Sequence, residues 1–192
     1  TELQSRVLVN AAGPWVSQVA ASITPATIQP ATDLIQGAHI VLNEPRVRDI
    51  YYVEAPQDGR AVFVMPWKDR TLVGTTETLF SGADPAAVSP TTGETDYLKE
   101  VVAHYFPGTQ IMPVSAFAGL RVLPRNQKTA FGRSRELMLV RHRRLQPHVL
   151  HLYGGKLTSY RADAQRALDI IRPMLPKRKQ LGDTRQLRLD PA

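Results

Sequence analysis

Apolar positions along the chain fall into short runs with two different spacings. Runs rich in Val, Ile, Leu and aromatic residues, bounded by turn residues, predict β-strands. They cover residues 6–10, 34–42, 50–54, 61–67, 71–76, 115–123, 137–141 and 149–153. The run 61–65 is apolar at alternate and intervening positions alike, so we expect an interior strand that is covered on both faces. The last two runs are joined by a basic loop and are expected to form a hairpin.

A helix is predicted most clearly over residues 91–106. Thr91 and Glu94 have the spacing of a capping box, and Pro107 and Gly108 follow where the helix must end. The apolar stripe of this helix consists of Tyr97, Leu98, Val101, Val102 and Tyr105.

Two further helices are expected near the ends of the chain. Pro14 is suited to a first helical position, and the apolar face of the helix that it begins carries Trp15, Val19 and Ile23. The last helix runs from about Thr158 to Leu175, with Tyr160, Ala164, Ala167, Leu168 and Ile171 on its apolar stripe. The order of strand and helix, then mostly strands, then strand and helix predicts an α/β domain interrupted by a β-rich insertion.

The composition excludes several kinds of catalytic and metal-binding site. The chain has 192 residues, 43% of them hydrophobic, and no cysteine, which excludes disulfides, thiolate metal sites and a cysteine nucleophile. Its five histidines show no metal-ligand spacing with carboxylates, so no metal is expected. The sequence contains no P-loop, no nucleophile elbow and no GxGxxG after a strand.

A net charge of +7 favours an anionic partner. Basic residues concentrate in 141–144 and in a tail over 177–192, without interleaved aromatic residues, so we expect no nucleic acid partner. A solvated loop and tail, or an anionic membrane surface, stay open. No apolar run is long enough to span a bilayer. Because the chain begins without Met and close to a strand, we expect it to be an internal fragment of a longer protein.

Three places carry candidate chemistry. Gly154 and Gly155 end a strand, Lys156 follows, and a helix begins with Thr158 available as its cap, which favours a negatively charged ligand. An ordinary glycine turn with a solvated lysine is the alternative.

Arg121 shares a strand face with Gly119, which leaves room for a ligand, and its planar fork suits a carboxylate or phosphate. An internal ion pair is the alternative for this arginine. His39, on the face of Gly37, is a candidate proton acceptor or a satisfied core histidine, and the stretch around Thr75 offers hydroxyls beside a glycine.

Five motifs in order resemble the flavin-dependent glycerol-3-phosphate dehydrogenases, within the wider group similar to D-amino-acid oxidase. They are residues 9–15 (Val-Asn-Ala-Ala-Gly-Pro-Trp), 36–41 (Gln-Gly-Ala-His-Ile-Val), 74–77 (Gly-Thr-Thr-Glu), 118–121 (Ala-Gly-Leu-Arg) and 154–161 (Gly-Gly-Lys-Leu-Thr-Ser-Tyr-Arg). The resemblance runs from about residue 6 to about residue 175. Gln36 and Glu77 depart from the family, in which lysine and aspartate are usual at these positions.

The resemblance implies oxidation of sn-glycerol 3-phosphate to dihydroxyacetone phosphate, with electrons passing through FAD to membrane quinone. It also implies hydride transfer from substrate carbon C2 to the flavin. The FAD-binding residues it implies are Asn10, Ala11, Ala12, Gly13, Thr75, Gly154, Gly155, Lys156, Leu157 and Thr158. The residues expected to contact the substrate and carry the catalysis are His39 as base, Arg121 and Lys156.

The resemblance also implies an α+β organisation. Residues 1–25 and 124–176 are expected to be part of an α/β FAD-binding domain, and residues 26–123 an inserted β-rich substrate domain with a mixed or antiparallel sheet and a flanking helix. Residues 177–192 are expected to be a basic tail. Family members are cytoplasmic and peripherally attached to the inner membrane; a homodimer stays open. The fragment alone is expected to be inactive. The alternatives are an FAD-dependent amino-acid or hydroxy-acid oxidase and a non-catalytic binding module.

Overall fold

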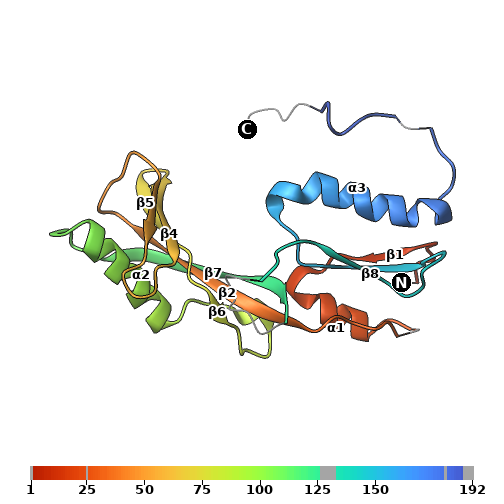
Figure 1. Cartoon of the computed structure of the whole chain (residues 1–192), viewed down its shortest axis with the longest axis horizontal. Helices are drawn as coiled ribbons and strands as arrows, with labels where there is room; N and C mark the ends of the chain where they lie inside the picture. The colour runs from red at the N-terminus through yellow and green to blue at the C-terminus, as the bar shows by residue number, and fades with distance from the viewer. Residues whose placement is uncertain (1, 25, 126–132, 180, 188–192) are drawn as a thin grey trace. The chain divides into compact units, whose positions relative to one another are not determined.

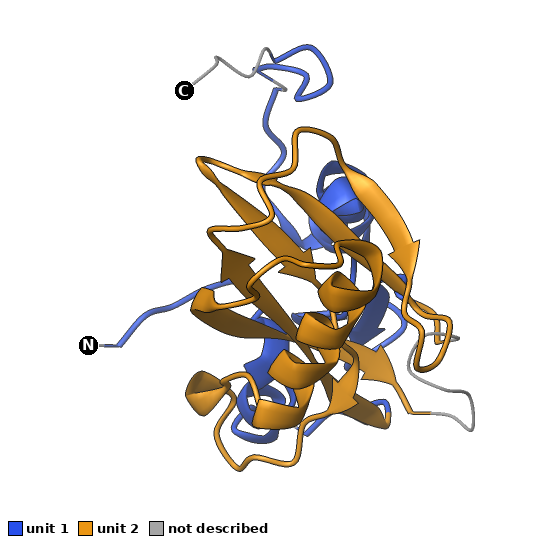
Figure 2. Ribbon diagram, turned by 90° about the vertical axis from the view of Figure 1, so that its left-hand side faces the viewer, with its two compact units in different colours: residues 1–30, 135–192 blue, residues 31–134 orange. Residues whose placement is uncertain are grey.

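The computed structural model describes residues 2–24, 26–125, 133–179 and 181–187. The chain divides into two compact units, one formed by residues 1–30 and 135–192 and the other by residues 31–134 (Figure 2). We call them the first and the second unit. Position 180 and residues 188–192 of the expected basic tail lie outside the described residues. The α+β class expected from the sequence is confirmed, with a largely antiparallel sheet and few helices.

The second unit is built on a six-stranded antiparallel sheet in the order β3-β4-β5-β2-β6, with β7 paired to β2 (Figure 1). Its strands are β2 (Thr32–Leu42), β3 (Tyr51–Glu54), β4 (Ala61–Trp67), β5 (Arg70–Gly74), β6 (Thr78–Leu79) and β7 (Pro113–Pro124). The longest pairing in this sheet is between β2 and β7. It runs from Thr32 opposite Pro124 to Leu42 opposite Pro113. The sequence did not predict the short strand β6 or the 3-10 turn η2 (Pro85–Ala87).

Helix α2 (Thr92–Tyr105) packs on one face of this sheet and completes the core of the unit. Leu98, Val101 and Val102 are fully buried against apolar residues of the strands, among them Ile40, Leu42, Val62, Val64 and Val73. The predicted capping box is confirmed, because Thr91 accepts from the backbone of Glu94 and Glu94 accepts from the backbone of Thr91. Tyr105 is 41% exposed and lies outside the buried part of the stripe.

Strand β4 is interior in the sheet, as predicted, but it is not covered on both faces. Val62 and Val64 are completely buried on the face that packs in the core, whereas Phe63 on the other face is 39% exposed. Phe63 meets Tyr52 of the neighbouring strand edge-to-face, with ring centroids 5.3 Å apart. The apolar run therefore belongs to a strand that is buried on one face only. On its exposed face an aromatic pair, Phe63 with Tyr52, accounts for the apolar character.

The first unit contains a three-stranded sheet in the order β1-β9-β8. The predicted hairpin is confirmed: β8 (Met138–Arg141) and β9 (Val149–Tyr153) pair antiparallel. Strand β1 (Leu8–Asn10) runs parallel to β9, with Asn10 opposite His151. The helical segments are η1 (Gly13–Trp15), α1 (Val16–Ala21), η4 (Leu157–Ser159), α3 (Tyr160–Ile171) and η5 (Arg172–Met174).

One predicted helix face was wrong and another was only partly right. Helix α1 buries Val16 and Ala20, while Trp15 and Val19 are 37% and 36% exposed. The buried face is therefore displaced by one residue, about 100° around the helix, from the predicted one. Helix α3 buries Ala167 of its predicted stripe together with Asp163, whereas Tyr160 of that stripe is 61% exposed. Within the described parts of the chain, no helix is long and apolar enough to cross a membrane.

Candidate cofactor and substrate sites

Two turns lie at one edge of the sheet in the first unit. Strands β1 and β9 are parallel neighbours, so the segments that follow their carboxyl ends, 11–13 and 154–158, emerge on the same side. Cofactors in α/β proteins bind at this edge of parallel strands. The structure therefore brings together nine of the expected FAD-binding positions: Asn10, Ala11, Ala12, Gly13, Gly154, Gly155, Lys156, Leu157 and Thr158.

Glycine is required in both turns by backbone conformation. Gly13 has φ of +55°, Gly154 of +74° and Gly155 of +95°, values that side-chain-bearing residues rarely adopt. A Cβ added to Gly13 would meet no atom within 4 Å among the described residues. The backbone at this turn thus has open space beside it, into which a ligand can pack.

The helical segment after Gly155 begins without a side-chain cap. Lys156 is the N-cap of η4 and Ser159 that of α3, and neither makes a side-chain capping hydrogen bond in the described structure. Thr158 lies inside the 3-10 turn, so its expected role as a cap was wrong: the helix starts one turn earlier, as 3-10. Uncapped N–H groups with the helix dipole attract negative charge.

Lys156 forms an ion pair with Glu136 in this structure. Both side chains are largely exposed, at 45% and 65%, and such pairs contribute little to stability. The lysine can therefore exchange this partner for a ligand at low cost.

A buried polar network supports the first turn, and no motif or spacing in the sequence marks its histidine. Asn10 is 3% exposed, and its Nδ2 donates to the carbonyl of Val16 (2.9 Å) and to Nδ1 of His151 (3.0 Å). Its Oδ1 accepts from the backbone N–H of Ala12 (3.2 Å). Because Nδ1 of His151 accepts, Nε2 carries the proton and donates to Thr27 Oγ1 at 3.0 Å. Asn10 thus holds the turn from inside the sheet.

This network predicts that acid destabilises the chain. Burial, with a smaller effect of His142, lowers the pKa of His151 below its ordinary 6.5. The unfolded chain therefore binds this proton more readily. The stability contributed by neutral His151 is full above pH 6.5 and is lost as pH falls from there through the lowered pKa.

Thermal unfolding between pH 7.5 and 5 checks this, with His151→Gln as the comparison. The variant is expected to have a lower Tm at pH 7.5 and a flatter dependence of Tm on pH than the natural chain. Equal slopes for the two proteins would show that His151 does not cause the acid sensitivity.

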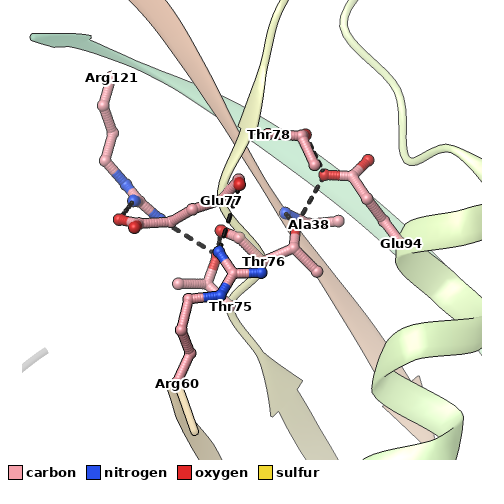
Figure 3. Close-up of polar contacts among 8 residues, drawn as sticks. All are labelled: Ala38, Arg60, Thr75, Thr76, Glu77, Thr78, Glu94 and Arg121. Carbon is pink, nitrogen blue, oxygen red and sulfur yellow. Dashed lines mark hydrogen bonds and ion pairs between the residues drawn. The ribbon is translucent and has the colours of Figure 1, made fainter. Parts of the chain in front are cut away.

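The second unit places Arg121 in an ion pair. Its Nη1 donates to Glu77 Oε1 at 2.6 Å and its Nη2 to Thr75 Oγ1 at 3.2 Å (Figure 3). The side chain of Glu77 is 5% exposed and that of Arg121 27%. The internal ion pair that the sequence left open for Arg121 is therefore present, and it fixes the guanidinium in one orientation while part of it stays accessible.

Two glycines opposite each other in β2 and β7 have different surroundings. A Cβ on Gly37 would lie 2.5 Å from both Arg121 Nη2 and Thr75 Oγ1. A Cβ on Gly119, its partner across the strands, would meet nothing within 4 Å among the described residues. Gly37 thus makes room for the guanidinium, and Gly119 leaves the open surface that the sequence predicted.

His39 is half-buried on β2, between Phe117 of β7 and Gly74 of β5. Its ring stacks on Phe117, with centroids 5.1 Å apart and planes 8° from parallel. Its Nδ1 is buried and has no hydrogen-bond partner among the described residues. Burial, and the positive charge of Arg121, lower the pKa of His39 below 6.5, so the ring is neutral at pH 7.

The predicted residues therefore form two groups. The turn residues and Lys156 belong to the first unit, and His39, Thr75 and Arg121 to the second. Among the described residues no cluster of three or more potential metal ligands is found.

Comparison with known proteins identifies the family. The profile described as FAD dependent oxidoreductase matches residues 1–161. The chain belongs to the FAD-dependent oxidoreductase family. It is 36% identical over 177 residues to a glycerol-3-phosphate dehydrogenase of Pseudomonas aeruginosa, covering 89% of this chain and 34% of that protein. It is 34% identical to the aerobic glycerol-3-phosphate dehydrogenase of Escherichia coli, covering 88% of this chain and 35% of that protein.

A solved structure of this family is similar as well. The glycerol-3-phosphate dehydrogenase from Bacillus halodurans, complexed with FAD, superposes with a TM-score of 0.73 at 28% identity. The match covers 89% of this chain and 32% of that one. This chain spans about a third of the length of the curated relatives it matches, 34% for the Pseudomonas aeruginosa protein.

Proposed function

We propose that the full-length protein oxidises sn-glycerol 3-phosphate to dihydroxyacetone phosphate with FAD as its cofactor. The observation that carries the proposal is the 36% identity to the Pseudomonas aeruginosa glycerol-3-phosphate dehydrogenase over 89% of this chain. The positions of the candidate residues support it, since each unit groups side chains and turns suited to one part of the reaction.

The residues of the first unit fit a flavin dinucleotide. Two glycine turns at the carboxyl ends of parallel strands allow close backbone approach, and an uncapped helix start favours negative charge. In the proposal, residues 10–13 and 154–158 hold FAD, with Lys156 contributing positive charge to the substrate phosphate or the cofactor. Thr75 of the second unit is proposed as a further contact. Bound FAD supplies the acceptor of a two-electron oxidation.

In the second unit, His39 and Arg121 are proposed to act on the substrate. His39 takes the proton of the substrate's C2 hydroxyl, because its lowered pKa keeps the ring neutral and able to accept. Arg121, oriented by Glu77 and Thr75, donates N–H groups to substrate oxygens. The open surface over Gly119 gives the substrate room beside the guanidinium.

We further propose that the electrons pass to membrane quinone and that the protein lies peripherally on the cytoplasmic face of the inner membrane. The support is the net charge of +7, with a basic run at 141–144 that suits an anionic membrane surface. We expect a full-length preparation to bind vesicles containing anionic lipid at low salt and to be released as the salt concentration rises.

The proposal is tested by flavin reduction in the purified full-length protein. Under anaerobic conditions, sn-glycerol 3-phosphate is expected to bleach the flavin absorbance, while glycine, other amino acids and unphosphorylated glycerol leave it unchanged. Bleaching by an amino acid or a simple hydroxy acid alone would replace this proposal with an oxidase of another substrate class. A protein purified with no flavin, and unable to take it up, would contradict an enzymatic role.

Replacing the proposed base should remove most activity. His39→Gln in the full-length protein is expected to lower kcat/KM by about 10²- to 10⁴-fold, the usual contribution of general base catalysis. In the natural enzyme, kcat/KM should fall on the acid side as His39 is protonated, with an apparent pKa below 6.5. His104→Gln, at an exposed histidine of α2, is the matched control and should keep full activity. An unchanged rate and pH profile in His39→Gln would exclude His39 as the base.

A further inference from the structure

One carboxylate of the second unit accepts more hydrogen bonds than a helix cap uses. Glu94, in the first turn of α2, is 3% exposed. Its Oε2 accepts from the backbone and hydroxyl of Thr91 (3.0 and 3.1 Å) and from Gln36 Nε2 (2.5 Å). Its Oε1 accepts from the hydroxyls of Thr76 and Thr78, each at 2.7 Å. The bonds to Thr91 complete the capping box, whereas those to Thr76 and Thr78 reach a different segment of the chain.

This carboxylate is ionised at neutral pH. Burial alone would raise the pKa of Glu94, but the hydrogen bonds from Thr91, Thr76 and Thr78 outweigh it and hold the pKa below its ordinary value. Hydrogen bonds to a charged acceptor are about twice as strong as neutral ones. The two threonines are therefore held firmly.

The held segment carries the partners of Arg121 on its other side. Thr76 and Thr78 point toward Glu94, and Glu77 between them points the opposite way, to Arg121 (Figure 3). This is the alternation of side chains along an extended backbone. Fixing the two threonines consequently fixes the direction in which the Glu77 carboxylate is presented.

Two neighbours hold the same segment by hydrogen bonds to its backbone and to the Thr76 side chain. Thr76 Oγ1 accepts from the N–H of Ala38 (2.8 Å), and the N–H of Thr76 donates to the Ala38 carbonyl (3.3 Å). Arg60 Nη1 donates to the carbonyl of Glu77 at 3.2 Å. Besides these contacts to β2 and to Arg60, which precedes β4, the hydroxyls of Thr76 and Thr78 both donate to the carboxylate of Glu94 (Figure 3).

We propose that Glu94 is a positioning residue for substrate binding, acting through Thr76, Thr78 and Glu77 on the orientation of Arg121. The inference rests on the proposed role of Arg121 toward the substrate. Glu94 links helix α2 to a guanidinium that it does not itself touch, so its loss misaligns a substrate contact without removing it. Displacement of a positioning group by about 1 Å can cost roughly 100-fold in rate.

The test compares threonine variants of the full-length enzyme. Thr78→Val removes one hydroxyl with little change of shape at an exposed residue, and Thr78→Ser retains the hydroxyl. Thr78→Val is expected to lower kcat/KM for sn-glycerol 3-phosphate by about 10-fold with unchanged flavin content, and Thr78→Ser to restore it. Glu94→Gln places an amide NH2 donor beside the donating hydroxyls of Thr76 and Thr78, and it should lower kcat/KM further. An unchanged kcat/KM in both Thr78→Val and Glu94→Gln overturns the proposal.

Helix capping is separated from positioning by Thr91→Ala. This variant removes the cap hydroxyl and leaves Thr76 and Thr78 bonded to Glu94. It is expected to lower Tm while kcat/KM stays unchanged. If Thr91→Ala lowers kcat/KM as much as Glu94→Gln does, the effect of Glu94 comes from helix stability, and the proposal is wrong.

A double-mutant cycle tests whether the effect passes through Arg121. In an Arg121→Lys background, Thr78→Val should change kcat/KM by less than about twofold, because the two changes share one route. The same loss in both backgrounds would show independent action and contradict the inference.

Crystal structures of Thr78→Val and Glu94→Gln distinguish this inference from the proposed function. Here the Arg121–Glu77 pair is expected to be shifted or broken, whatever the substrate. If the pair moves but the natural enzyme does not oxidise sn-glycerol 3-phosphate, the proposed function fails and the positioning role stands. An Arg121–Glu77 pair that is unmoved in both variants overturns the positioning role.

Discussion

Arg121→Ala is expected to lower kcat/KM for sn-glycerol 3-phosphate by about 10²- to 10³-fold, the usual cost of losing one preorganised donor to a developing charge. The same change leaves the Glu77 carboxylate, 5% exposed, without the guanidinium that now bonds it at 2.6 Å. Removing one partner of a buried ion pair is costly, so Tm should fall as well. Steady-state kinetics and thermal unfolding of the full-length protein measure the two effects.

The matched control is Arg125→Ala. This arginine directly follows β7, the strand that carries Arg121. Its Nε forms an ion pair with Asp33 Oδ1 at 2.7 Å, but its side chain is 65% exposed. Its loss removes the same charge from the second unit and should leave kcat/KM unchanged. An Arg121→Ala enzyme with lowered Tm and near-normal kcat/KM would mean that the Arg121–Glu77 pair serves the fold alone.

Gly37→Ala is expected to cost both stability and activity. The new Cβ would lie 2.5 Å from Arg121 Nη2 and from Thr75 Oγ1, and 3.2 Å from the carbonyl of Thr76, so these groups must move. Overpacking of this kind costs about 1–3 kcal/mol of unfolding free energy. Because the displaced group is the proposed substrate contact, kcat/KM should fall by roughly 100-fold. Denaturant unfolding and steady-state kinetics measure these losses.

Gly119→Ala provides the comparison on the facing strand. Gly119 is paired with Gly37 across β2 and β7, and its Cβ would meet nothing within 4 Å in the described structure. Its stability should match that of the natural chain to within about 0.5 kcal/mol. A loss of stability equal to that of Gly37→Ala would indicate that any side chain between the two strands is unfavourable, and would contradict the specific clash with Arg121.

Local signals in the sequence predicted most elements well. Helix α2 was placed correctly because its capping box and its stop at Pro107 involve residues close together in the chain. The β8–β9 hairpin was predicted for the same reason. The buried face of α1 was missed because Val16 with Ala20 and Trp15 with Val19 have the same apolar spacing, so the spacing alone does not decide which pair is buried.

Contacts between residues far apart in the sequence could not be predicted. The hydrogen bond of Asn10 with His151 joins residues 141 apart, and neither residue has a spacing that marks it. Likewise, Arg121 and Glu77 are 44 residues apart. An ion pair of Arg121 could therefore be predicted from the sequence, but not which carboxylate forms it. The sequence predicted room for a ligand at Gly119, two residues before Arg121, but not the glycine that makes room for the guanidinium itself. The close approach occurs at Gly37, because strand pairing decides which side chains meet.

The parallel pairing of β1 with β9 has a consequence for the order of folding. Asn10 leaves the ribosome 141 residues before its partner His151, which takes roughly 7–28 s at about 5–20 residues per second. In that interval β1 has no strand to join, whereas the second unit already holds all its own strands. Its first and last strands pair at Thr32 and Pro124, so a folded second unit brings its ends together and shortens the loop that β1 must close. We therefore expect the inserted unit to fold first during synthesis and to assist the completion of the sheet edge that carries both glycine turns.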